Sequence, residues 1–262
     1  MRKFTFDNEL KILEHFRDNS YPPLGLPENN DNIKIIHSLY KDINWKSWIN
    51  NSGKDQLPPD FYNNKEKLML EVMGVDDHAS NEGKINLIKK NENIMLNELD
   101  SSGILDKLSP NATVITLTDS KLKTEEDHNY VRYFENFRRI VKKHSKQVNN
   151  YRNNYPNYKL IFFVFDESSG CYFETPKSTR KVPIQMGLEL SGNIHYHWLD
   201  KKFVDVIEKS KVDYFIWYKP FNSFETRAGT NDILPKVIIY DLKNMKVNKI
   251  EYKSTQMFSS EI

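Results

Sequence analysis

The chain has 262 residues, of which 38% are hydrophobic and 13% are aromatic. That content supports a substantial core and excludes a disordered chain. With 38 basic and 36 acidic residues, the net charge is +2, so the whole molecule has no strong electrostatic attraction to nucleic acid or membranes. A single cysteine, Cys171, excludes a disulfide framework and a multi-cysteine zinc or iron–sulfur centre.

The N-terminus lacks the apolar core of a secretory signal, and no run of about 18 apolar residues occurs in the chain. We therefore expect a protein without membrane spans that is cytoplasmic.

The first part of the chain carries helical patterns. Residues 7–17 and 31–50 have apolar side chains at helical spacing, whereas residues 18–30 are rich in Asn, Pro and Gly and predict a loop. We expect residues 1–56 to form a helical N-terminal portion.

Strands and helices alternate through the rest of the chain. Residues 158–165 are continuously apolar, which is typical of a strand buried on both faces. Strand propensity also favours residues 67–75, although their Leu, Met, Glu and Lys content would suit a helix. The remaining predictions are helices at 91–101, 126–155 and 200–209, strands at 114–117 and 214–218, and a C-terminal hairpin at 236–252.

This alternation predicts an α/β fold, a three-layer sandwich in which helices flank a mixed central sheet. No linker divides the chain, so we expect a single α/β domain over residues 1–262. Glycine-rich phosphate-binding loops, the G-x-S-x-G elbow and the H-E-x-x-H zinc motif are missing from the sequence, which argues against the enzyme classes that depend on them.

Residues 59–78 carry the clearest chemical pattern, since acidic side chains, lysines and a histidine surround one predicted hairpin. Asp60 and Glu71 would meet on neighbouring strands, and Lys67 would share the side of Glu71 because strand side chains alternate. Two carboxylates and an ammonium can hold Mg²⁺ and orient a water molecule for phosphodiester hydrolysis. The alternative is a polar hairpin with solvated charges.

Pro59-Asp60 followed by Glu71-Val72-Met73 resembles the motif of the PD-(D/E)xK nuclease superfamily. The resemblance implies a Mg²⁺-dependent nuclease of the restriction or repair type, with Asp60 and Glu71 as metal ligands. Met73 occupies the family's lysine position, so Lys67 would have to replace that lysine. This departure leaves open a catalytically inactive nuclease-like scaffold that binds protein or nucleic acid.

A second set of residues resembles the RecB-type members of the same superfamily. These are Asp106 as metal ligand, Asp119 and Lys121 as a D-x-K pair, and Gln147 and Tyr151 on a helix beside the site. The alternative for Gln147 and Tyr151 is an exposed helix face. Both sets cannot form the active centre of one such fold.

Two histidines form a third candidate. His195 and His197 would lie on one side of a strand and could bind a transition metal with Asp200, although packing and hydrogen bonding also explain such residues. Residues 76–78 and 125–128 are similar clusters, and the second suits the acidic first turn of the helix at 126–155.

The long helix also carries a run of basic residues. Its side chains could contact phosphate or form a solvated helix face. The run comprises Arg138, Arg139, Lys142, Lys143, Lys146 and Arg152.

Overall fold

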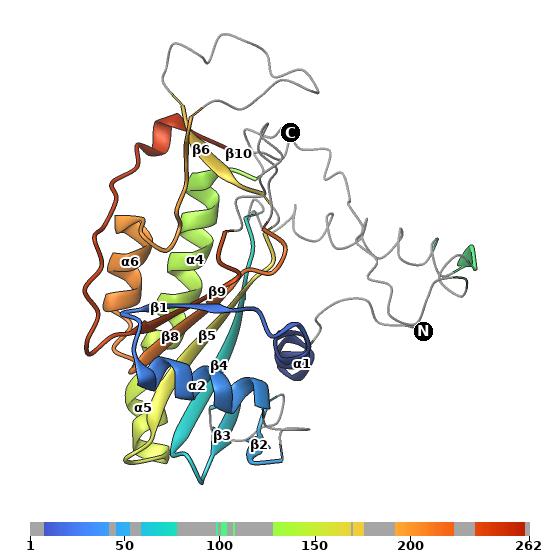
Figure 1. Cartoon of the computed structure of the whole chain (residues 1–262), viewed down its shortest axis with the longest axis vertical. Helices are drawn as coiled ribbons and strands as arrows, with labels where there is room; N and C mark the ends of the chain where they lie inside the picture. The colour runs from blue at the N-terminus through green and yellow to red at the C-terminus, as the bar shows by residue number, and fades with distance from the viewer. Residues whose placement is uncertain are drawn as a thin grey trace.

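The computed structural model contains one large mixed sheet, one small antiparallel sheet and helices on both faces of the large sheet (Figure 1). Nearly all of the description covers seven segments, with a few isolated positions between residues 98 and 107. The segments are residues 8–41, 46–52, 59–77, 128–168, 170–175, 192–222 and 234–259.

The large sheet has seven strands, and its three central ones, β8, β5 and β4, run parallel to one another. A meander of antiparallel strands adds β3 and β2 beside β4, and β9 pairs antiparallel to β8 and parallel to β1. In spatial order the strands are β1 (Pro23–Leu26), β9 (Val237–Asp241), β8 (Tyr214–Tyr218), β5 (Lys159–Asp166), β4 (Leu68–Val75), β3 (Phe61–Asn63) and β2 (Trp48–Asn50).

Helices cover both faces of this sheet, as expected for a three-layer sandwich. One face packs against α1 (Glu9–Asn19) and α2 (Asn30–Lys41), and the other against α4 (Tyr130–Ser145), α5 (Val148–Asn154) and α6 (Lys201–Glu208). The small sheet comprises β10 (Met257–Ser259), β6 (Tyr172–Glu174) and β7 (Asn193–Ile194), and η4 (Ser254–Gln256) leads into β10.

Strand β5 shows why the sheet forms the middle layer. Its side chains alternate between two hydrophobic clusters, with Phe162 and Val164 on the α4 side and Ile161 and Phe163 on the α1 side. All four are fully buried, which confirms the burial expected from the continuous apolar run.

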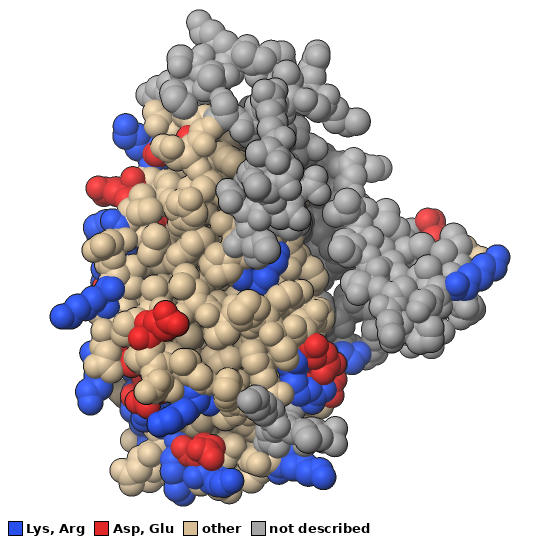
Figure 2. All heavy atoms as spheres, viewed as in Figure 1, with Lys and Arg blue, Asp and Glu red and all other residues tan. Residues whose placement is uncertain are grey.

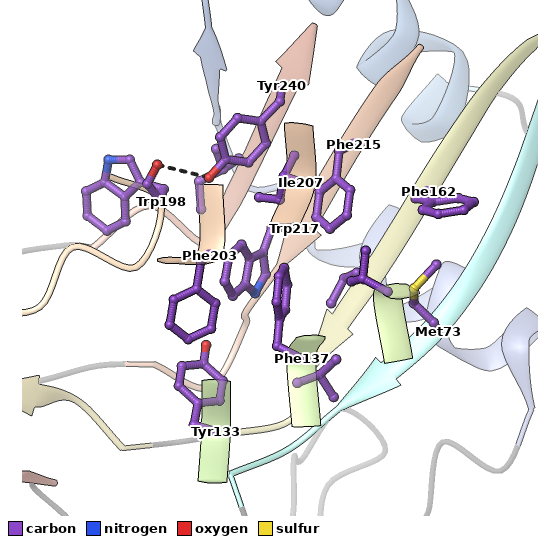
Figure 3. Packing of buried hydrophobic residues seen from close by; sticks show 14 of the residues in the cluster. Met73, Tyr133, Phe137, Phe162, Trp198, Phe203, Ile207, Phe215, Trp217 and Tyr240 are labelled. Atoms are coloured by element: carbon purple, nitrogen blue, oxygen red, sulfur yellow. Dashed lines mark hydrogen bonds between the residues drawn. The ribbon is translucent and has the colours of Figure 1, made fainter. Parts of the chain in front are cut away.

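Aromatic side chains dominate the core beneath α4 and α6 (Figure 3). The Trp217 ring stacks on Phe137 with a centroid separation of 4.5 Å and also packs against Phe203. The Tyr240 hydroxyl donates to the carbonyl oxygen of Trp198 at 3.0 Å. This packing fixes α4 and α6 on the sheet, because ring pairs at such separations add stabilisation beyond area burial.

The N-terminal segment contains two strands that its sequence pattern does not predict. The segment expected as a loop at 18–30 includes β1, and the segment expected as one helix at 31–50 contains α2 and then β2. Both strands are short, and their backbone partners come from β9 and β3. Tertiary pairing therefore overrides local propensity here.

The helix expected over 126–155 is divided. Asn129 caps α4, because its side chain accepts a hydrogen bond from the Arg132 N–H, and two turn residues at 146–147 separate α4 from α5. The acidic first turn predicted from residues 125–128 is wrong, since the first turn of α4 contains no acidic residue.

The prediction of a C-terminal hairpin at 236–252 is also wrong. Strand β9 forms as expected, but its partners are β1 and β8, while Ile250 forms an isolated parallel bridge with Asp200. The predicted elements at 91–101 and 114–117 lie largely or wholly outside the described residues.

Candidate functional site

The hairpin between β3 and β4 forms as its sequence predicts. The Asn63 side chain accepts hydrogen bonds from the backbone N–H groups of Lys65 and Glu66, each at 3.0 Å, which closes the turn. Lys67 takes a positive φ of 54° before β4 begins at Leu68. This local chemistry sets the register of the two strands.

Asp60 directly precedes β3, and Glu71 follows Leu70, which is the β4 partner of Phe61. The Asn51 N–H donates to the Asp60 carbonyl oxygen at 2.7 Å, and the backbone bends at Asp60 before β3 begins. The Asp60 carboxylate accepts a hydrogen bond from the N–H of Val72, the residue after Glu71, and the charge of Glu71 acts on the pKa of Asp60. The structure therefore brings together the two carboxylates selected from the sequence.

The environment of Asp60 favours its protonated form. Burial, reinforced by the negative charge of Glu71, raises the pKa of Asp60 to about 7, and Glu9 of α1 adds a smaller effect in the same direction. A hydrogen bond from the Val72 N–H to Asp60 Oδ2, 2.8 Å long, opposes this shift and anchors the side chain. Asp60 therefore lies in a site where negative charge is concentrated and poorly solvated.

Glu71 is almost completely buried, with 5% of its surface exposed. Its Oε1 atom lies 2.8 Å from His144 Nδ1 and accepts a hydrogen bond of 2.9 Å from the Tyr151 hydroxyl. Burial, together with the charge of Glu71, raises the pKa of Tyr151, so Tyr151 remains a donor. Glu71 Oε2 is buried and has no hydrogen-bond partner among the described residues.

His144 was missed by the sequence reasoning, although its position carried a signal. It lies seven residues after Phe137 and three after Val141, both on the buried face of α4. A polar side chain at such a position must find a partner in the core, and that partner is Glu71.

Lys67 is not brought to the acid pair. Its Nζ atom lies 3.4 Å from the Tyr158 hydroxyl and 4.9 Å from the centre of that ring. Met73, at the family's lysine position, is 4% exposed and packs in the core. The pair thus lacks the ammonium group that the motif resemblance implied.

The donor set limits which metals would suit this site. Within the described part of the chain, no group of three or more His, Cys, Asp or Glu side chains is arranged to hold a metal ion. Mg²⁺ commonly takes one or two carboxylates and completes its shell with water and phosphate oxygens, so two carboxylates with a buried unpartnered oxygen fit Mg²⁺.

The RecB-type residues are only partly described. Asp106, Asp119 and Lys121 lie outside the described residues. Gln147 is exposed, and its side chain accepts a hydrogen bond of 2.7 Å from Asn150. Tyr151, by contrast, is buried and contacts Glu71, so the exposed-face alternative is wrong for this residue.

The histidine pair does not lie on a strand, because β7 ends at Ile194. His195 Nε2 lies 2.8 Å from Asp200 Oδ2, whereas the His197 ring packs against Trp198 and Trp217. Burial lowers the pKa of both histidines. These contacts match the packing and hydrogen-bonding alternative to a metal site.

A separate buried polar cluster lies where the three parallel strands end. Asp77 follows β4, Asp166 ends β5 and Lys219 follows β8. Lys219 Nζ lies 3.8 Å from Asp166 Oδ2, and Asp166 also accepts hydrogen bonds from the Trp217 indole at 2.9 Å and from the Tyr133 hydroxyl. All three strand-end residues are at most 2% exposed.

Asp77 contacts two residues that are distant from it in the sequence. It lies 3.1 Å from His128 and accepts a hydrogen bond from the Tyr172 hydroxyl at 2.8 Å. Hydrogen bonding and charge from His128 outweigh the effect of burial and lower the pKa of Asp77. With its carboxylates paired, this cluster suits a structural role.

Comparisons with protein-family models, with curated proteins and with solved structures returned no match. In the part of the chain that the structure describes, no helix is both long enough and apolar enough to cross a membrane.

Proposed function

We propose that this protein is a Mg²⁺-dependent phosphodiesterase of the nuclease type, in which Asp60 and Glu71 bind the metal. The observation that carries the proposal is Glu71 Oε2, a buried carboxylate oxygen without a partner among the described residues. It lies on a side chain whose charge raises the pKa of the neighbouring Asp60. A cation between the two carboxylates would satisfy the oxygen and relieve their repulsion.

The surrounding residues would prepare this pair for a cation. His144 and Tyr151 engage Oε1 of Glu71 and leave Oε2 available. The Val72 N–H holds Oδ2 of Asp60, and among the described residues no hydrogen bond engages Oδ1. The bound metal would polarise a phosphate group. Because both side chains are held by neighbours, little reorganisation would accompany binding.

Metal binding and cleavage test the proposal. We expect Mn²⁺, as a spectroscopic substitute for Mg²⁺, to bind with a stoichiometry of about one in calorimetry or electron paramagnetic resonance. Wild-type protein should nick plasmid DNA or cut RNA in Mg²⁺ or Mn²⁺. Glu71→Gln and Asp60→Asn should lose both properties, whereas Glu208→Gln, at a surface ion pair with Lys249, should keep them. Unchanged Mn²⁺ binding by a folded Asp60→Asn/Glu71→Gln variant would contradict the proposal.

A nuclease-like scaffold without catalysis is the second candidate. It is favoured by the position of Lys67, whose ammonium contacts Tyr158, and by Met73, which lies in the core. A hydrolytic site built on the expected motif would need a lysine near the carboxylates. Wild-type protein that binds nucleic acid but leaves DNA and RNA uncut in both metals would favour this candidate.

A further inference from the structure

Helix α4 carries a line of cations on its outer surface. Every member of this set, which we name the α4 ridge, is exposed, and none has an ion-pair partner among the described residues. The ridge comprises Arg132, Arg139, Lys142, Lys143 and Lys146.

The charge of this region differs from that of the whole chain. Residues 130–154 contain seven basic residues and one acidic residue, although the complete chain has a net charge of only +2. The acidic residue, Glu135, is already engaged by Arg138 at 2.5 Å. The face that presents α1 and α2 instead shows both signs of charge interspersed (Figure 2). Positive charge is therefore concentrated along α4 and α5.

Helix geometry aligns these cations. Arg132, Arg139, Lys143 and Lys146 follow one another at intervals of seven, four and three residues, which places them along one side of the helix. The fourteen residue steps from Arg132 to Lys146 span about 21 Å at 1.5 Å per step. This length matches an extended charged polymer better than a small anion.

Helix α4 links the ridge to the acid pair through His144. His144 lies between Lys143 and Lys146 in the sequence and contacts Glu71. A polyanion lying along α4 would thus pass close to the helix turn that supports the proposed metal ligand. The apolar side of α4 is buried against the sheet, whereas a helix that binds membranes inserts its apolar side into lipid.

We infer that the α4 ridge binds the sugar-phosphate backbone of a nucleic acid, which is the substrate class of the Asp60–Glu71 site. This inference rests on the proposed function. Lysine and arginine contacts to phosphate release counterions, so they give affinity that is independent of base sequence and falls steeply with salt. The ridge accordingly selects a phosphodiester polymer without selecting a sequence.

The test compares nucleic-acid binding by two triple variants in EDTA. Arg139→Ala/Lys143→Ala/Lys146→Ala removes three ridge cations, and Lys34→Ala/Lys243→Ala/Lys246→Ala removes three exposed cations outside α4. Fluorescence anisotropy with duplex DNA, single-stranded DNA and RNA would be recorded over a salt series. We expect the ridge variant to lose at least about tenfold in affinity, with a log–log salt slope smaller by about 2.7 for duplex DNA and about 2 for single strands. The control should resemble wild type.

Several outcomes would overturn the inference. One is a folded ridge variant that binds all three nucleic acids with the affinity and salt slope of wild type. Another is an equal loss in both variants, which would indicate a general charge effect. A third is wild-type protein that binds anionic phosphatidylserine vesicles but no nucleic acid.

The same variants separate this inference from the proposed function. We expect the ridge variant to keep Mn²⁺ binding at Asp60 and Glu71. If the ridge variant loses nucleic-acid binding while Asp60→Asn/Glu71→Gln still binds Mn²⁺, the proposed function is contradicted and the inference about the ridge is supported. If the ridge variant keeps its nucleic-acid affinity while Glu71→Gln loses Mn²⁺ binding, the inference about the ridge is contradicted and the proposed function is supported.

Discussion

His144 Nδ1 lies 2.8 Å from Glu71 Oε1 and so joins helix α4 to the central strand β4. The two side chains are 20% and 7% exposed, so little water competes for this contact. The contact fixes Glu71 relative to the helix that carries the α4 ridge on its exposed side.

Loss of His144 should destabilise the fold. His144→Ala removes one of the two partners of a nearly buried carboxylate, which should lower the free energy of unfolding by about 1–3 kcal/mol. Urea denaturation would measure the change. His37→Ala, at an exposed position on α2, should change it by less than about 0.5 kcal/mol. In the double variant His144→Ala/Glu71→Gln, the loss of free energy of unfolding should be smaller than the sum of the two single losses. Full additivity would show that the two residues do not interact in solution.

Asp60 should make stability depend on pH. Its pKa is about 7 in the folded protein and about 3.9 in an unfolded chain, so between these values the native state holds a proton that the unfolded state releases. The free energy of unfolding should therefore fall as pH rises from about 4 to about 7 and then level off. The contribution of Asp60 has an upper limit of about 4 kcal/mol.

Asp60→Asn isolates this contribution. Asparagine can still accept the Val72 N–H but carries no charge, so the variant should be more stable than wild type above pH 7 and should gain little at pH 4. Thermal or urea unfolding at several pH values provides the measurement. A variant whose pH profile parallels that of wild type would assign the dependence to another group.

The central layer could be predicted because its strands are locally unambiguous. Residues 158–165 and 214–218 are apolar runs too short for separate helices and rich in aromatic and branched side chains, and they became β5 and β8. Strands β1 and β2 could not be predicted from local patterns. The backbone partner of β1 is β9, which is distant in sequence, and that of β2 is the short strand β3. The division of the long helix at residues 146–147 had no proline or glycine to mark it.

Only half of the acid site followed from the sequence. Asp60 and Glu71 could be expected near each other because a hairpin with an Asn turn fixes the pairing of β3 with β4. Helical spacing places His144 near the buried face of α4, but its contact with Glu71 and that of Tyr151 depend on how α4 and α5 pack against β4. Lys67 was placed on the side of Glu71 by strand alternation, but it lies in the turn before β4 with a positive φ, so the alternation does not extend to it.

Metal affinity should follow the ionisation of Asp60. A cation needs the ionised carboxylate, so below pH 7 binding must displace a proton. The apparent dissociation constant for Mn²⁺ should fall about tenfold per pH unit between pH 5 and 7 and change little above that range. Calorimetry in buffers of different ionisation enthalpy should detect about one released proton near pH 6. Proton release of zero there would mean that Asp60 does not bind the metal.

Lys219 should matter for stability and not for metal binding. Its ammonium is 2% exposed and lies 3.8 Å from the fully buried Asp166. Lys219→Met keeps much of the packed stem but leaves Asp166 without its cation, and breaking a buried pair in this way costs about 3–5 kcal/mol. Lys209→Met, at an exposed position after α6, is the matched control and should be nearly neutral.

Measuring Mn²⁺ binding at Asp60 and Glu71 distinguishes an effect of Lys219→Met on stability from an effect on the proposed metal site. Lys219 lies beyond the carboxyl end of β8, whereas the acid pair lies on β4 and the residue before β3, so the metal affinity of folded Lys219→Met should match wild type. The carboxyl ends of parallel strands are also where ligands commonly bind in α/β folds. A Lys219→Met protein with normal stability that loses nucleic-acid cleavage would therefore move the active centre to the Asp77, Asp166 and Lys219 cluster.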